Sequence, residues 1–361
     1  MRKGQATVAV GTSIMGFLFA VSLPLQAQHA DAATGPAWSN SANWKTATAT
    51  ETDNIVYATV PLIHNQSAAA SRDPGLPRGI RTPVSNTGPA GTMDLHLDVY
   101  QVASSKPAPV VIQIHGGGWI RGDRPSSSRS FGPFFAAGAS VVAVQYRNAI
   151  DAPAPAAIGD VRCAMAWVKA NAKKYNFDLS RVITWGGSAG GHLALMAAYA
   201  PASFTPKTCS DQPKIAAVLD DYGPTNLAEG LTEHGSMDFT HQWLGLDLPL
   251  TPEASSQEST GRPAAPRWPD PSTELLAKAK AMSPLTYVQP GLPPTFIVNG
   301  DSDHTVDPSQ SAELKKALDD AHVPARQYIV AGGGHGNFSP EEQQKSMLLS
   351  LEFLRAHGVI D

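Results

Sequence analysis

Short hydrophobic runs alternate with helix-forming stretches along most of this chain. Leu95–Tyr100 alternates apolar and polar residues, which is typical of a half-buried antiparallel strand. Continuous apolar runs indicate strands buried on both faces, and they occupy 109–114, 139–144, 181–185, 215–219, 295–298 and 327–330. Helices are predicted over 156–174, over 189–200 and from Ser339, an N-cap that Pro340 follows. Strands that alternate with helices predict an α/β fold with a mostly parallel sheet and helices on both faces.

Two segments interrupt this alternation. Residues 28–91 are rich in Ala, Ser, Thr, Asn and Pro, and we expect an irregular N-terminal segment at the edge of a domain that spans 92–361. Residues 228–282 contain short helical pieces but no clear strand. An insertion just outside the carboxyl ends of parallel strands lies where such sheets bind ligands, so we predict a cap or lid there. A simple surface excursion is the alternative.

The first 27 residues have the pattern of a secretory signal peptide. Arg2 and Lys3 precede an interrupted apolar stretch, Val8–Leu25, and an Ala-rich zone follows. The alternative is an uncleaved membrane anchor. We expect a secreted or periplasmic protein without stable membrane insertion after cleavage, because no later segment is apolar enough to span a bilayer.

The charge and the cysteine content indicate which partners, disulfides and metal sites to expect. The 361 residues carry a formal net charge of −4 and no run of basic residues, which excludes nucleic acid as an expected partner. The two cysteines, Cys163 and Cys209, form an even pair that predicts a disulfide in an exported protein, with two free thiols as the alternative. No Cys/His ligand spacing is present, so we expect no metal and no cofactor.

Ser188 is the candidate nucleophile. It lies in a G-x-S-x-G match, 186–190, between a predicted strand and a predicted helix, which is the context that a nucleophile elbow requires. Small residues are needed where strand and helix approach each other, and Gly186 and Gly190 supply them. A flexible glycine-rich turn is the alternative for the pentapeptide alone.

A second motif, His115-Gly-Gly-Gly-Trp119, follows the buried strand at 109–114. Three glycines let the main chain approach a ligand and direct N–H groups toward it, as in the oxyanion loop of lipases and esterases. We predict that Gly117, Gly118 and Ala189 form the oxyanion hole, although the sequence does not decide which two loop glycines donate. Trp119 is a candidate substrate contact, with ordinary packing as the alternative.

The third and fourth motifs supply an acid and a base in the order Ser, Asp, His. Three aspartates follow the strand at 295–298. Asp307 precedes Pro308 and suits an N-cap, and Asp301 suits the turn, so Asp303 is the predicted catalytic acid, with Asp221 as a distant alternative. His335, in a glycine-rich loop beyond the last strand, is the predicted base.

Together these motifs resemble those of secreted carboxylesterases with the α/β-hydrolase fold, in the branch related to hormone-sensitive lipase that includes bifunctional feruloyl/acetyl esterases. The resemblance covers roughly residues 92–361. It implies a serine carboxylesterase that hydrolyses short-chain acyl or plant-polysaccharide-type esters, acetyl or feruloyl, through an acyl-enzyme. The alternatives are an amide hydrolase similar to arylformamidases and a non-catalytic hydrolase-like binding protein.

Overall fold

An eight-stranded sheet organises the computed structural model, which describes residues 36–63, 91–125, 128–231, 238–245 and 270–361. The strand order is β1-β2-β4-β3-β5-β6-β7-β8. β2 is antiparallel to both β1 and β4, and every other neighbouring pair is parallel. The strands are β1 (Thr50–Pro61), β2 (Thr92–Gln101), β3 (Ala108–Ile114), β4 (Ser140–Val144), β5 (Phe177–Gly187), β6 (Ile215–Asp221), β7 (Thr295–Gly300) and β8 (Ala325–Val330).

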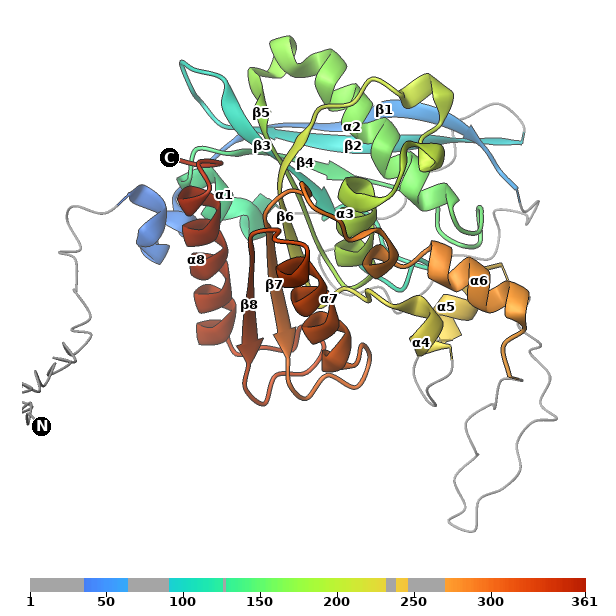
Figure 1. Ribbon diagram of the computed structural model, residues 1–361. Helices are drawn as coiled ribbons and strands as arrows, with labels where there is room; N and C mark the ends of the chain where they lie inside the picture. Colours follow the sequence, from blue (N-terminus) through green and yellow to red (C-terminus); the bar gives the residue numbers. More distant parts are fainter. Residues whose placement is uncertain (1–35, 64–90, 126–127, 232–237, 246–269) are drawn as a thin grey trace, which may run out of the picture. The chain divides into compact units, whose positions relative to one another are not determined.

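Helices cover both faces of this sheet (Figure 1). The principal helices are α1 (Gly132–Ala136), α2 (Ala156–Tyr175), α3 (Ala189–Tyr199), α7 (Pro308–Asp320) and α8 (Pro340–Ala356). The core side chains of α2, α3 and α7 belong to one buried cluster, and those of α1 and α8 belong to another. The predicted mostly parallel sheet with helices on both faces is therefore confirmed.

The central strand β3 shows why the sequence folds in this way. All seven of its residues are buried. Val110, Ile112 and Ile114 pack in the α2/α3 cluster, whereas Val111 packs in the α1/α8 cluster. Since successive side chains of a strand point to opposite faces, only a continuous apolar run can fill both cores.

The helix starts follow the predicted capping chemistry. The Asp307 side chain accepts a hydrogen bond from the Ser309 amide at the start of α7, 2.8 Å away. Ser339 accepts one from the Glu342 amide at the start of α8, 3.2 Å away. Both helices have Pro in the first turn, where its missing N–H costs nothing.

The N-terminal segment is more regular than the sequence indicates. Within the range predicted to be irregular, 28–91, the twelve residues of β1 extend the sheet by pairing with β2. Most of β1 is exposed or half-buried, with two register shifts along its pairing. An edge strand of this kind lacks the clear alternation that marks a half-buried strand, which is why the prediction missed it. Two short 3-10 helices, η1 (Ala37–Ser39) and η2 (Ser41–Lys45), precede it.

The predicted insertion at 228–282 contains short helices and no strand in its described parts. These helices are α4 (Leu227–Gly230), α5 (Asp238–Trp243) and α6 (Thr273–Ala281). The rest of the insertion, 232–237 and 246–269, lies outside the described residues, as does the predicted signal peptide. Among the helices that the structure describes, none has the length and apolarity needed to cross a bilayer.

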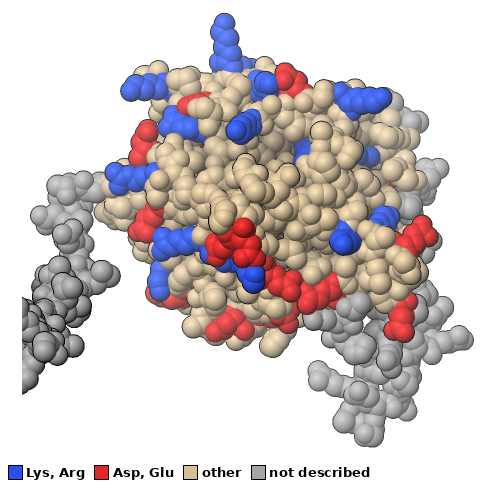
Figure 2. Space-filling view, viewed as in Figure 1, with Lys and Arg blue, Asp and Glu red and all other residues tan. Residues whose placement is uncertain are grey.

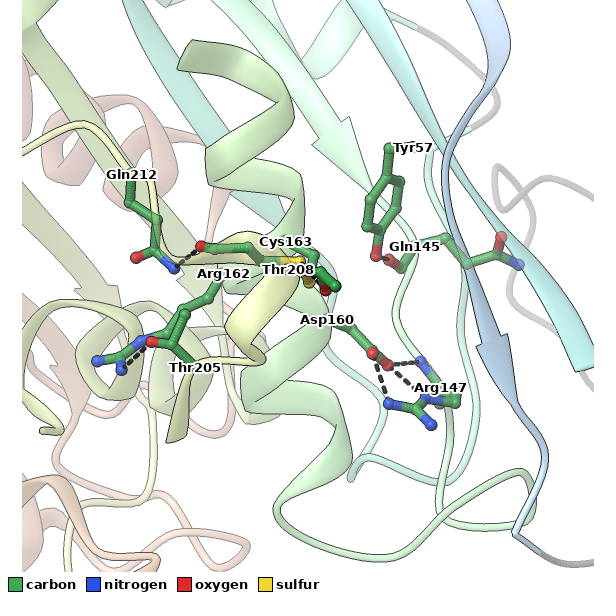
Figure 3. Close-up of a disulfide and its surroundings, with 10 residues drawn as sticks. Tyr57, Gln145, Arg147, Asp160, Arg162, Cys163, Thr205, Thr208 and Gln212 are labelled. Atoms are coloured by element: carbon green, nitrogen blue, oxygen red, sulfur yellow. Dashed lines mark hydrogen bonds and ion pairs between the residues drawn. A yellow bond between two sulfur atoms is a disulfide. The ribbon is translucent and has the colours of Figure 1, made fainter. Parts of the chain in front are cut away.

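The predicted disulfide between Cys163 and Cys209 is present (Figure 3). It joins α2 to the loop between α3 and β6, with the two Cα atoms 4.9 Å apart. Arg162 fastens the same loop through Nη1, which donates to the Pro201 carbonyl at 2.8 Å and to Thr205 Oγ1 at 2.9 Å. Arg162 and Cys163, which are adjacent in α2, thus hold the loop that follows α3.

Charged side chains of both signs are scattered over the face shown in Figure 2. Lys and Arg are interspersed with Asp and Glu there, and no continuous basic band crosses that face. This distribution agrees with the small net charge of the sequence.

Candidate active site

Ser188 occupies a sharp turn between β5 and α3. Its backbone has φ 57° and ψ −124°. Residues other than Gly rarely adopt a positive φ. Its amide donates to the carbonyl of Asp221 at 2.8 Å, at the end of β6. The predicted strand–Ser–helix context is present, and a strained backbone at such a turn is typical of a functional residue.

Gly186 and Gly190 allow this turn to form. A Cβ atom on Gly186 would lie 2.5 Å from the carbonyl carbon of Gly190, and a Cβ atom on Gly190 would lie 2.2 Å from the Ile114 carbonyl oxygen. Real Cβ atoms do not approach backbone atoms so closely. The two glycines of the motif are therefore needed because β3, β5 and α3 meet at this point.

The structure brings Ser188, His335 and Asp303 together from three separate loops. Nε2 of His335 lies 2.8 Å from Oγ of Ser188, and Nδ1 lies 2.7 Å from Oδ2 of Asp303. The other carboxylate oxygen of Asp303 accepts from the amides of Thr305 and Val306 at 2.8 and 3.0 Å. Each residue is thus hydrogen-bonded to the next with no gap in the chain of contacts.

Hydrogen bonding keeps the Asp303 carboxyl ionised. Burial alone would raise its pKa, but hydrogen bonds from His335, Val306 and Thr305 outweigh burial and lower the pKa below its usual value. A carboxylate at this position accepts a hydrogen bond from the Nδ1–H group of His335. The unprotonated Nε2 then faces the hydroxyl of Ser188.

The glycine loop, residues 115–119, contains the predicted oxyanion donors and passes directly beside Ser188. A Cβ atom on Gly116 would lie 3.5 Å from the Cβ of Ser188, and Gly117 and Gly118 have φ values of 118° and 61°. A Cβ on Gly118 would meet the ring of Phe239, in α5, at 2.7 Å. The described part of the insertion therefore packs against the predicted oxyanion loop.

Trp119 does not occupy the position predicted for a substrate contact. Its side chain is buried, with 2% exposure, and it stacks on Trp243 with the ring centroids 4.7 Å apart. Its Nε1 donates to Nδ1 of His192 at 3.2 Å. Because the indole is enclosed by its own chain, Trp119 packs the core beneath the loop, which corrects the prediction that it contacts substrate.

The remaining candidate residues have structural contacts. His115 lies buried, stacked on Tyr146 with ring centroids 4.1 Å apart, and burial lowers its pKa. Asp301 accepts from the Gly332 amide at 2.7 Å and so joins the two loops that carry Asp303 and His335. Asp221, the alternative acid, accepts from Trp185 Nε1 at 2.8 Å.

Tyr222 is a neighbour of the site that sequence reasoning missed. It follows β6, has a positive φ of 48°, and its ring lies 4.9 Å from the His335 ring in an edge-on arrangement. A Cβ added to Gly187 or Gly336 would meet its hydroxyl at 2.9 or 2.6 Å. Neither the backbone conformation nor these contacts leave a local signal in the sequence.

These contacts allow a definite chemistry. A serine hydroxyl, a histidine that accepts its proton and a carboxylate that orients the histidine form the arrangement required for nucleophilic acyl transfer. Within the ranges that the structure describes, no cluster of three or more His, Cys, Asp or Glu residues has the geometry to hold a metal ion.

Several known proteins that resemble this chain are esterases. The BD-FAE family model matches residues 97–318. Esterase LipQ of Mycobacterium tuberculosis is 29% identical over 279 residues, which are 76% of this chain and 61% of LipQ. Esterase LipC of the same organism is 28% identical over 235 residues, which are 64% of this chain and 54% of LipC. The chain thus spans little more than half the length of these curated relatives.

Solved structures agree with this relationship. A thermophilic esterase of Thermogutta terrifontis with butyrate bound superimposes with a TM-score of 0.59 at 25% identity, covering 78% of this chain and 96% of that esterase. The family model alone covers more than half of the 361 residues. The chain therefore belongs to the BD-FAE family and has the α/β-hydrolase fold of the carboxylesterases that its motifs resemble.

Proposed function

We propose that this protein is a serine carboxylesterase in which Ser188, His335 and Asp303 form the catalytic triad. The continuous hydrogen bonding from Ser188 Oγ through both nitrogens of His335 to Asp303 carries this proposal. The esterase relatives support the same reaction class.

The proposed reaction proceeds in two acyl-transfer steps. His335 removes the proton of Ser188 as the hydroxyl attacks the ester carbonyl, and Asp303 stabilises the imidazolium that forms. Main-chain N–H groups of Gly117, Gly118 and Ala189 are the proposed donors to the oxyanion. His335 then protonates the departing alcohol. In the second step His335 takes a proton from water as the water attacks the acyl-enzyme, and it returns that proton to Ser188 as the acid leaves.

We propose short-chain acyl esters as substrates, including acetyl and feruloyl esters of plant-polysaccharide type. The butyrate named for the Thermogutta terrifontis esterase supports a short acyl group. The apolar N-terminal stretch, Val8–Leu25, supports export to the periplasm or the medium.

Two measurements test the reaction class. A fluorophosphonate should label the parent protein but not the Ser188→Ala variant, and that variant should lose about six orders of magnitude in kcat on an aryl acetate. Ser188→Ala protein that kept a tenth of the parent activity would contradict the proposal.

Panels of substrates test the proposed preference for short acyl chains and for esters over amides. We expect acetyl and butyryl aryl esters to be cleaved faster than the octanoyl ester. We also expect ester cleavage to exceed cleavage of an N-formyl anilide, the substrate type of an arylformamidase. Preference for octanoyl would overturn the short-acyl assignment, and preference for the anilide would favour amide hydrolysis.

A further inference from the structure

A deep groove lies behind the His335 loop, and the chemistry described above does not use it. It has a volume of about 1370 Å³. Residues 40–49, which include η2, form one wall, α1 adds to that wall, and the first half of α8 forms the other. Figure 1 shows the N-terminal helical pieces beside α1 and α8, at the face of the sheet opposite α2 and α3.

The floor of this groove consists of residues at the carboxyl ends of the central strands. Trp185 and Asp221, from β5 and β6, are only partly buried although their strands are interior. Trp185 Nε1 donates to Asp221 Oδ2 at 2.8 Å, so one carboxylate is fixed beside an indole at the bottom of the groove. Two central strands that leave a Trp and an Asp partly exposed provide anchoring groups for a ligand.

The rest of the lining combines aromatic rings with neutral polar groups. Trp44 and Phe338 contribute aromatic surface, and Gln343 and Gln344 contribute amides. Among the described residues that line the groove, Lys45 and Asp221 are the only ones with a full charge. Aromatic faces with scattered amide, hydroxyl and carboxylate groups suit a neutral polyhydroxylated ligand, whereas a polyanion would meet a single cation, Lys45, among the described lining residues.

The groove adjoins the side of the site from which the alcohol departs. Tyr222 lines the groove, and its ring also contacts the ring of His335. Gly336, the residue after His335, lines the groove as well. Since the leaving alcohol takes its proton from His335, the alcohol portion of the ester must lie on the His335 side of Ser188.

We propose that this groove binds sugar rings adjacent to the esterified ring of an oligosaccharide substrate. The proposal rests on the proposed esterase function and adds a binding site for the alcohol portion of the substrate. Tyr222 contacts the His335 ring and also lines the groove. A monosaccharide ester at Ser188 would therefore not extend past Tyr222 into the groove, whereas an oligosaccharide ester would.

Binding and kinetics test the groove separately from the reaction. Xylohexaose should bind to the catalytically inactive Ser188→Ala protein in isothermal titration calorimetry. Adding Trp44→Ala or Gln344→Ala should weaken that binding, by about two- to twelvefold for Trp44 because stacked aromatic contacts are worth about 0.5–1.5 kcal/mol. Trp167→Ala is the matched control, since Trp167 lies on α2 and packs against the opposite cluster.

In the active enzyme, the readout is the ratio of kcat/KM for acetylated xylohexaose to kcat/KM for acetylated xylose. The Trp44→Ala and Gln344→Ala variants should lower this ratio, and Trp167→Ala should not. Gln344 is exposed, so its variant tests the groove even if Trp44→Ala does not fold.

Absence of xylohexaose binding at millimolar concentration, or binding that neither groove variant weakens, would overturn the proposal. Such a result would leave the esterase assignment untouched. Conversely, full aryl acetate hydrolysis by Ser188→Ala would overturn the esterase assignment without affecting oligosaccharide binding.

Discussion

Nε1 of Trp119 lies 3.2 Å from Nδ1 of His192, and this contact fixes the proton on the imidazole. An indole N–H can only donate, so Nδ1 of His192 must accept. The proton of the neutral ring is therefore on Nε2, which donates to the carbonyl of Met282 at 2.7 Å. One buried imidazole thus joins the glycine loop, the Ser188 helix and the end of the insertion.

Replacing His192 with Leu should destabilise the protein. The side chain is fully buried, and the substitution would leave the Trp119 N–H and the Met282 carbonyl without their partner. Each unpaired buried group costs about 1–3 kcal/mol, so for the two groups we expect the free energy of unfolding to fall by about 2–6 kcal/mol in urea titrations. His304→Ala, at an exposed histidine, is the control and should change it by less than about 0.5 kcal/mol. A Leu variant as stable as this control would contradict the structural role.

The same histidine should make stability depend on pH. Burial lowers the pKa of His192 from 6.5 to about 4, and the Met282 hydrogen bond only partly opposes this. Between these values the unfolded chain binds a proton that the folded protein excludes. The stabilisation from the neutral ring is therefore complete above pH 6.5 and is lost as the pH falls toward 4, by about 3 kcal/mol.

Comparison of the parent with His192→Leu isolates this contribution from other titrating groups. Asp221, for example, has its pKa raised to about 6 by burial and changes stability in the opposite direction as the pH falls. The difference in unfolding free energy between parent and variant should therefore shrink between pH 7 and pH 4. A difference that stays constant over this range would rule out the pH dependence assigned to His192.

Local signals account for what the sequence predicted well. The apolar run of β3 predicts a buried strand, and the glycines around Ser188 predict a tight turn. The chain order Ser, Asp, His then indicates which loops meet. The burial of Trp119 could not be predicted in this way, because it depends on stacking against Trp243, a residue of the insertion. Tyr222 was missed for the same reason, since its role depends on contacts with His335 that are distant in sequence. Properties that arise only when remote segments meet leave no local pattern.

Asp303→Asn should disable catalysis while preserving the loop. The amide oxygen of Asn can still accept from Thr305 and Val306, but its NH₂ group would then face Nδ1 of His335. Nδ1 would have to accept, the proton would move to Nε2, and His335 could no longer take the proton of Ser188. We expect kcat on an aryl acetate to fall about 10⁴-fold with little change in Tm.

Asp307→Asn is the matched control for that experiment. Asp307 caps α7 through a bond from the Ser309 amide, and Asn caps helices about as well as Asp. This variant should keep the parent kcat. If both substitutions lowered kcat alike, loop geometry rather than the tautomer of His335 would explain the effect.

The disulfide should stabilise the fold mainly by restricting the unfolded chain. Cys163 and Cys209 are 46 residues apart, and closing a loop of that length is worth about 4 kcal/mol in the chain-entropy account. The Cys163→Ser/Cys209→Ser double variant should therefore unfold at a lower urea concentration than the parent protein. Dithiothreitol should lower the parent midpoint toward that of the double variant and leave the double variant unchanged. An equal response of both proteins to the reductant would show that the bridge is not the source of the stabilisation, because the double variant has no cysteine to reduce.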